Sequence, residues 1–185
     1  MPIIQISLLK GYAPDIRHRL ATKVTDLIVQ MLGAVPEGTT VAIPELDRSS
    51  YMRGRELKTP IAPPPEATEV VKAYLAAMEA RDLTTAKSYL AEDFWMEFPG
   101  GIRMHTLEEL VTWAKPRYQS VTKTYDGFSE AYELEETVVF CHGRLQGTWP
   151  NGGAFSDIRF IDRFSLSKGK LTSQLVWNDL GEAQC

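Results

Sequence analysis

The 185-residue sequence predicts an α+β protein built from two units, and three observations predict this class. The first stretch has the periodicity of a strand, a helix and a second strand within about 58 residues. Three consecutive prolines, Pro63 to Pro65, then favour a stiff, extended segment. Beyond them, helical patterns come before a series of strand-like runs, which is an α+β order. We therefore expect a βαβ unit over residues 1–58, a Pro-rich linker over 59–65 and a second α+β unit over 66–185.

In the first unit, strand and helix periodicity follow one another. Ile4, Ile6 and Leu8 alternate with polar residues, which predicts a strand. Apolar residues at helical spacing run from Ile16 to Leu32, and Gly33 follows where a helix C-cap belongs. A second strand is expected over 39–46, with a right-handed crossover, and a turn or hairpin over 49–54. A unit this small, with unpaired strand edges, is expected to assemble with copies of itself.

Pro2 opens the first strand and is the candidate catalytic residue of this unit. Once the initiator Met1 is removed, as we expect, Pro2 carries a secondary amine. An α-amino group has a reference pKa of about 7.7–8.0, and burial in an apolar site lowers this pKa because it disfavours the charged form. Such an amine can accept a proton near neutral pH. The alternative is that Pro2 only starts a strand, where its missing N–H costs nothing.

Residues 2–56 resemble the 4-oxalocrotonate tautomerase family. The motifs that carry the resemblance are Pro2-Ile3-Ile4-Gln5-Ile6, Lys10-Gly11, Leu32-Gly33-Ala34 and Val41-Ala42-Ile43-Pro44-Glu45. The resemblance implies that Pro2 is a general base acting on enols and 2-oxo acids, in a hexamer built as a trimer of dimers. The two substrate-binding arginines of the family are replaced here by Tyr12 and Thr40, whereas its aromatic residue is kept as Tyr51. The implied substrate site therefore has Tyr51, Tyr12 and Thr40 around Pro2, without the family's carboxylate clamp.

The second unit begins with helical patterns over 70–78 and 83–90 and a short strand over 94–98. A third helix is expected over 107–118, kinked or ended near Pro116. Strands are expected after it, over about 121–133, 137–149, 154–167 and 170–180. Within the third of these strands, Asp162 shares one face with apolar residues. These are Ile158, Phe160, Phe164 and Leu166. A carboxylate on an apolar face is costly as a charge, so we expect the pKa of Asp162 to be raised.

Residues 66–182 resemble the SnoaL-like and ketosteroid-isomerase-like group, which has the cone-shaped fold of nuclear transport factor. The resemblance rests on Ala80-Arg81-Asp82-Leu83, Ala91-Glu92-Asp93-Phe94, Phe160-Ile161-Asp162-Arg163-Phe164 and Val176-Trp177-Asn178-Asp179. It implies a pocket with Tyr74, Asp162, Phe98 and Trp177. Tyr74 and Asp162 stand at the places of a tyrosine and a protonated aspartic acid that form an oxyanion hole. The isomerase base and the cyclase acid are replaced by Phe98 and Val176. The alternative is that Tyr74 and Asp162 form a hydrogen-bonded polar pair in a ligand pocket or core.

Composition excludes several classes of function. Residues 1–58 carry a net charge of +2 and residues 59–185 one of −6, which argues against nucleic-acid binding. No apolar run approaches a membrane span and no signal peptide is recognised, so we expect a cytoplasmic protein. Cys141 and Cys185 form no disulfide framework. The three histidines lack metal-ligand spacing and no nucleotide fingerprint is present, so neither metal nor cofactor is expected.

Three hypotheses remain open, each with a small molecule as the partner. In the first, the protein is a tautomerase-type isomerase that uses Pro2 on an enol or a 2-oxo or unsaturated carboxylic acid. In the second, the first unit is not catalytic and only oligomerises the chain, and the second unit binds a small apolar ligand. In the third, the second unit is itself a SnoaL-like cyclase or isomerase.

Overall fold

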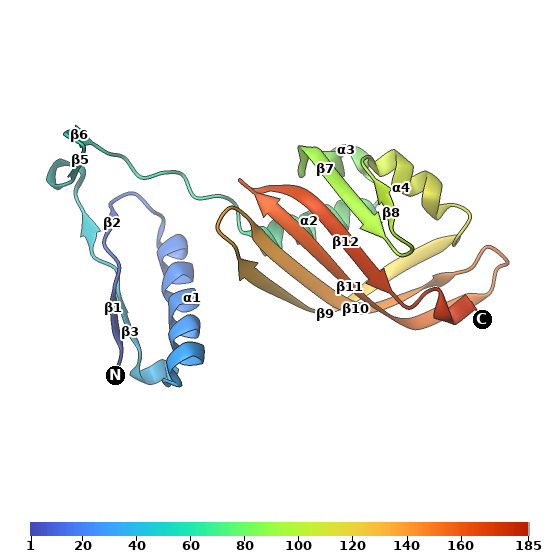
Figure 1. Ribbon diagram of the computed structural model, residues 1–185, viewed down its shortest axis with the longest axis horizontal. Helices are drawn as coiled ribbons and strands as arrows, with labels where there is room; N and C mark the ends of the chain where they lie inside the picture. Colours follow the sequence, from blue (N-terminus) through green and yellow to red (C-terminus); the bar gives the residue numbers. More distant parts are fainter. Residues whose placement is uncertain (185) are drawn as a thin grey trace. The chain divides into compact units, whose positions relative to one another are not determined.

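The computed structural model describes residues 1–184 and divides the chain into two compact units (Figure 1). The first unit is Met1–Pro63 and the second begins at Pro64, so the boundary falls within the Pro-rich segment. Both units mix helices and strands, which confirms the α+β class. Within residues 1–184, no helix has the length and apolar character needed to cross a membrane.

In the first unit, short parallel strand pairs accompany one long helix. Its elements are β1 (Ile3–Gln5), β2 (Leu8–Leu9), α1 (Pro14–Leu32), β3 (Thr40–Ala42), β4 (Glu45–Leu46), β5 (Met52–Arg53), β6 (Glu56–Leu57) and 3₁₀ turns at Pro36–Gly38 and Arg48–Ser50. β1 pairs with β3 and β2 with β4, both in parallel, and β5 and β6 form a hairpin. The single strand expected over 39–46 is therefore two strands, because Pro44 between them has no N–H to donate to a ladder.

The helix α1 begins and ends as the sequence predicts. Pro14 occupies its first turn, where a missing N–H is harmless, and Gly33 ends it in the left-handed conformation with φ +64°. Arg17 on α1 forms an ion pair with Glu45 on β4. No described residue of this unit is fully buried, and Ile3 and Met31 are 74% and 72% exposed. The unit by itself therefore lacks a closed hydrophobic core.

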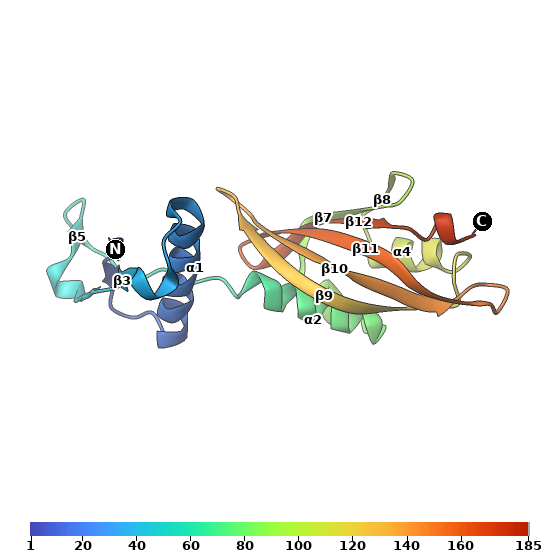
Figure 2. The same ribbon diagram turned by 90° about the horizontal axis from the view of Figure 1, so that it is seen from below.

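The second unit is a curved six-stranded sheet with helices against its inner face (Figures 1 and 2). Its elements are α2 (Ala67–Glu79), α3 (Leu83–Lys87), β7 (Leu90–Phe98), β8 (Ile102–Met104), α4 (Leu107–Ala114), β9 (Ser120–Tyr132), β10 (Thr137–Thr148), β11 (Ala154–Ser167), β12 (Lys170–Asn178) and a 3₁₀ turn at Glu182–Gln184. The strand order is β8-β7-β12-β11-β10-β9, and β7 and β12 are its one parallel pair.

Two elements near β7 differ from the expectation. The strand begins at Leu90 rather than at residue 94, because its first residue pairs with Leu171 of β12. β8 was not predicted, and it follows a tight turn in which Gly100 and Gly101 both have positive φ. The third helix, α4, ends at Ala114, two residues before Pro116, which agrees with the expected kink or end near this proline.

A bulge in β9 sets the inward-facing residues of the sheet. His142 of β10 pairs with Gly127 and Gly143 pairs with Tyr125, so Asp126 is an extra residue in β9. The shift allows Tyr125 and Phe128 to pack together against the core, with ring centroids 5.2 Å apart. Strict alternation would have placed these two rings on opposite faces of the sheet.

Candidate functional site

A cavity of about 390 Å³ lies in the second unit, within the size range of small-molecule sites. Its walls come from α2, the start of α3 and the turn before it, α4 and the segment after it, the first half of β9 and single residues of β7 and β12. Most of the wall is apolar, and the main apolar residues are Leu75, Met78, Leu83, Phe98, Leu110 and Val121. Such a cavity suits a small, mainly apolar molecule.

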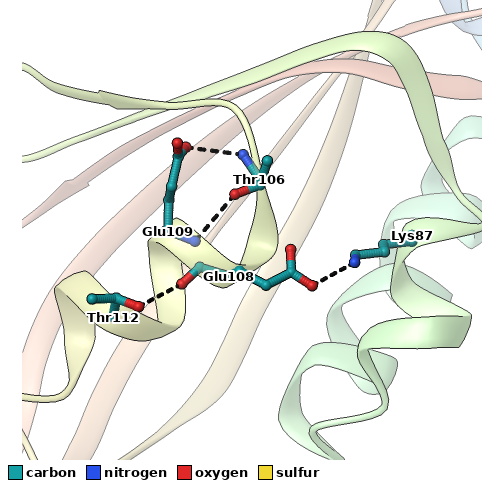
Figure 3. Close-up of polar contacts among 5 residues, drawn as sticks. All are labelled: Lys87, Thr106, Glu108, Glu109 and Thr112. Atoms are coloured by element: carbon teal, nitrogen blue, oxygen red, sulfur yellow. Dashed lines mark hydrogen bonds and ion pairs between the residues drawn. The ribbon is translucent and has the colours of Figure 1, made fainter.

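The wall formed by α4 is fixed by contacts at the start of this helix (Figure 3). Thr106 and Glu109 form a capping box: Glu109 N–H donates to Thr106 Oγ1 at 3.2 Å, and Thr106 N–H donates to Glu109 Oε2 at 3.1 Å. The backbone N–H groups of His105 and Thr106, which both donate to the Glu109 carboxylate, lower its pKa. Lys87 of α3 forms an ion pair with Glu108. α4 is therefore held at its first turn, with Leu110 on the cavity side.

A chain of four polar residues runs from the cavity wall into the core. Tyr74 Oη donates to Gln174 Oε1 at 3.2 Å, and Gln174 Nε2 lies 3.4 Å from Asp162 Oδ2. The ammonium of Lys123 pairs with the same oxygen of Asp162, and it lies 4.5 Å from the centroid of the Phe160 ring. Tyr74, Gln174 and Lys123 line the cavity, whereas Asp162 lies behind its wall and is fully buried.

Burial dominates the electrostatics of this chain. Full burial raises the pKa of Asp162, although the ammonium of Lys123 opposes the shift. Burial, and to a smaller degree the nearby Asp162, raises the pKa of Tyr74. Burial is also the main cause of the raised pKa of Tyr125, which lines the cavity too. Oδ1 of Asp162 is buried without a hydrogen-bond partner within residues 1–184. Because the pKa values of Tyr74 and Tyr125 are raised, both side chains stay neutral and can act as hydrogen-bond donors.

The structure brings together some of the predicted pocket residues of this unit and not others. Tyr74 and Phe98 line the cavity. The polar-pair alternative required a direct hydrogen bond between Tyr74 and Asp162. The structure has none, because Gln174 lies between them and bonds to both. Trp177 is 50% exposed and is not part of the cavity wall formed by the described residues. It neighbours the inward-facing Val176 on β12, and successive strand residues point to opposite faces.

The predicted residues of the first unit are only partly brought together. Pro2 is half-buried and its carbonyl accepts a hydrogen bond of 3.0 Å from the N–H of Thr40. Tyr12 and Tyr51 are also half-buried. Within residues 1–184, no hydrogen bond or ring contact joins either tyrosine to Pro2.

Sequence reasoning missed two residues of the polar chain, Lys123 and Gln174. Lys123 alternates with Val121 and Tyr125 along β9, so this strand pattern already carried a signal for an inward-facing lysine. Gln174 gave no such signal, because the consecutive residues Ser173 and Gln174 are both buried, with 5% and 4% exposure. This breaks the alternation of the strand, whose register shifts between Leu171 and Ser173.

The remaining thiol and carboxylate groups do not suggest a metal site. Within residues 1–184, no group of three or more His, Cys, Asp or Glu side chains is placed to hold a metal ion. Cys141 is a buried free thiol, and burial raises its pKa to about 12. Cys185, the other cysteine of the sequence, lies outside the described residues.

Comparison with known proteins finds a family match for each of the two units of the chain. The SnoaL-like domain family matches residues 71–174, and the tautomerase enzyme family matches residues 2–59. No curated protein is significantly similar to the chain.

Solved structures resemble the second unit in fold. An NTF2-like protein of unknown function from Burkholderia pseudomallei has a TM-score of 0.55 at 19% identity, over 63% of this chain and 93% of that chain. A putative polyketide cyclase from Xanthomonas campestris has a TM-score of 0.51 at 21% identity, over 63% and 93%. A putative ketosteroid isomerase from Shewanella frigidimarina has a TM-score of 0.50 at 19% identity, over 60% and 94%.

These likenesses agree with the curved sheet and its inner cavity, and the two family matches indicate an isomerase-type or ligand-binding role. The match over residues 71–174 covers more than half of the chain. The chain therefore belongs to the SnoaL-like domain family and carries a tautomerase-family unit ahead of that domain.

Proposed function

We propose that the SnoaL-like unit is an isomerase-type site that takes a small, mainly apolar carbonyl compound into the 390 Å³ cavity. The observation that carries the proposal is the ammonium of Lys123 in the wall of this largely apolar cavity. Removal of a proton next to a carbonyl places negative charge on the carbonyl oxygen. A fixed cation in a water-poor site stabilises that charge more than water does.

The polar chain fixes the position of the ammonium. Asp162 and the face of the Phe160 ring hold one side of Lys123, which leaves its remaining N–H groups for a ligand oxygen. Gln174 holds Asp162 from the other side by a hydrogen bond from Nε2, and Tyr74 in turn donates a hydrogen bond to Gln174. Glu79 is the carboxylate in the cavity wall and is the candidate proton acceptor. It would take the proton from one carbon and return it to another.

Exchange of carbon-bound protons tests this site. 2-Tetralone is a small apolar ketone whose C1 protons exchange for deuterium in heavy water, and NMR follows the loss of their signal. We expect the protein to speed this exchange, and we expect Lys123→Met and Glu79→Gln each to reduce the rate by at least about tenfold, within the usual contribution of such groups. Exchange at the rate of buffer alone would contradict the proposal.

A second candidate function is supported by the tautomerase-family match that starts at residue 2. In this candidate, Pro2 is the general base of a 4-oxalocrotonate-tautomerase-like isomerase that acts on an enol or a 2-oxo or unsaturated carboxylic acid. Its half-buried position at the head of β1 suits an amine with a lowered pKa. Tyr12, Thr40 and Tyr51 would line the substrate site. Ketonisation of phenylenolpyruvate, followed by absorbance, is the test of this candidate.

We also propose that the first unit assembles into a homo-oligomer, with a hexamer as the expected state. The support is the lack of any fully buried residue within residues 1–63, together with exposed apolar side chains on both β1 and α1. A unit of this size needs a partner surface to close a core. Copies of the same unit would supply that surface.

A further inference from the structure

The side chains that line the cavity of the second unit carry a net positive charge, whereas the unit as a whole is negatively charged. Residues 64–185 carry twelve Lys and Arg and eighteen Asp and Glu, a net charge of −6. Three of those twelve cations line the cavity, namely Arg81, Lys115 and Lys123, whereas Glu79 is the only acidic residue to do so in the part of the unit that the structure describes. A chance sample of this unit's charges would have been mostly acidic. The cavity is therefore biased towards an anionic ligand.

Two of these cations are available to a ligand. Lys123 is engaged with Asp162, but Arg81 and Lys115 have no ion-pair partner within residues 1–184. Among the other exposed cations of this unit, Lys87 pairs with Glu108 and Arg159 with Asp179, whereas Lys168, which lies outside the cavity wall, has no ion pair within residues 1–184. Arg81 and Lys115 are exposed residues of the cavity wall, so they lie where it opens to solvent.

The backbone at Arg81 supports a role for its side chain. Arg81 follows α2 with φ +58°, and its N–H donates to Met78 O at 3.1 Å while that of Asp82 donates to Ala77 O at 2.9 Å. This left-handed position at a helix end is the one that glycine favours, because a residue with a Cβ is strained there. An arginine at this point is unfavourable for the backbone, yet it puts a guanidinium in the wall of the cavity.

We propose that the ligand of this cavity is a small, mainly apolar carboxylate whose carboxylate group binds Arg81 and Lys115. The inference rests on the proposed function of the cavity and specifies its substrate class. A guanidinium matches a carboxylate with two parallel N–H donors, and the neighbouring ammonium adds a further charge-assisted bond. The apolar body of the ligand packs against Leu75, Met78 and Leu110. Its carbonyl oxygen then reaches Lys123 deeper in the wall.

A matched pair of probes tests the charge requirement. 2-Naphthoate and 2-naphthamide have nearly the same shape, but only the first is anionic, and calorimetry measures the binding of each to the full chain. We expect naphthoate to bind at least about tenfold more tightly, as charge-assisted hydrogen bonds suggest. Arg81→Gly and Lys115→Gln should each reduce this preference while leaving the affinity for naphthamide unchanged. Lys72→Gln, an exposed lysine outside the cavity wall, is the control and should change neither affinity.

Folding and location of binding are checked in the same series. Arg81→Gly should fold at least as well as the parent protein, because glycine relieves the left-handed backbone. Ala114→Trp should fill the cavity and abolish binding of both probes. Equal affinity for the two probes, with Ala114→Trp still blocking both, would overturn the carboxylate inference and leave the proposed cavity function standing. Binding that survives Ala114→Trp, or no binding of either probe, would overturn both.

Discussion

The ammonium of Lys123 on β9 is paired with the carboxylate of Asp162 on β11, across the intervening strand β10. The two partners are unequally buried: 23% of the Lys123 side chain is exposed, whereas none of the Asp162 side chain is. The cation can therefore meet a ligand in the cavity, while the anion is available only to its protein partners. This asymmetry makes Lys123 the polar centre of the site and Asp162 the residue that positions it.

The burial of Asp162 predicts an unusual dependence of stability on pH. Because the pKa of Asp162 is raised in the folded state, this residue binds a proton more strongly folded than unfolded. Its contribution to stability is complete below the unfolded pKa and is lost as the pH rises through the folded pKa. Asp162→Asn removes this titration. We expect urea unfolding from pH 3 to pH 8 to show the parent protein losing stability relative to Asp162→Asn as the pH rises. A parent that gains stability relative to the variant would mean a lowered pKa for Asp162.

The hydrogen bond from Tyr74 to Gln174 should contribute measurably to stability. Tyr74→Phe leaves Oε1 of Gln174 buried without its donor, and we expect a loss of about 1–3 kcal/mol in the free energy of unfolding. Tyr132→Phe is the control, because Tyr132 is 63% exposed and water can replace its hydrogen bond to Glu130. Denaturant unfolding of the two variants should separate them. Equal losses would show that the buried hydrogen bond contributes no more to the free energy of unfolding than the exposed one.

Gly143 should tolerate no side chain. A Cβ at this position would lie 1.9 Å from the carbonyl oxygen of Thr124, because the bulge in β9 brings that backbone close. We expect Gly143→Ala to lower the free energy of unfolding by about 3 kcal/mol or more, or to prevent folding. Gly181→Ala is the matched control, since nothing lies within 4 Å of its Cβ position. A Gly143→Ala variant that unfolds at the parent's urea midpoint would contradict the bulge geometry.

Pro2 is tested as a base by the substitution that keeps an amine. Pro2→Ala retains an N-terminal amino group after removal of Met1 but changes its basicity and geometry. If Pro2 is the base, the rate of phenylenolpyruvate ketonisation should fall at least about tenfold. Intact mass measurement accompanies the assay, because a retained Met1 acylates the nitrogen of Pro2. An unchanged rate in Pro2→Ala, or a retained Met1, would exclude Pro2 from proton transfer.

The open core of the first unit predicts assembly of the whole chain. Light scattering should give a mass of about six times the 20.8 kDa chain if a hexamer forms. Ile3→Glu introduces a charge at an exposed apolar position of β1 and should reduce this mass if β1 lies in the interface. Glu37→Gln, at an exposed polar position, is the control. A parent protein that is monomeric at micromolar concentration would contradict the assembly.

The local pattern of the sequence determined most of the fold. Alternating residues placed β9, β10, β11 and β12 within one or two residues of their ends, because side chains in a strand alternate with a period of two. Gly33 and Pro14 marked α1 because their backbone preferences are local properties. The same reasoning found the apolar face that carries Asp162, and the family resemblance implied Tyr74 as a pocket residue. The two family resemblances on which the functional hypotheses rest were also readable at this level.

Only the tertiary structure decided which residues meet at the site. The bulge at Asp126 arises from pairing between β9 and β10. No local pattern in the sequence therefore predicted that Tyr125 and Phe128 would lie on the same face of the sheet. Gln174 stands 100 residues from Tyr74 in the chain, and Lys123 stands 39 residues from Asp162. Such contacts depend on how distant strands lie across one another, and periodicity within a single strand carries no information about that. The sequence therefore determined which faces are apolar, whereas the curvature and register of the sheet decided which polar groups those faces enclose.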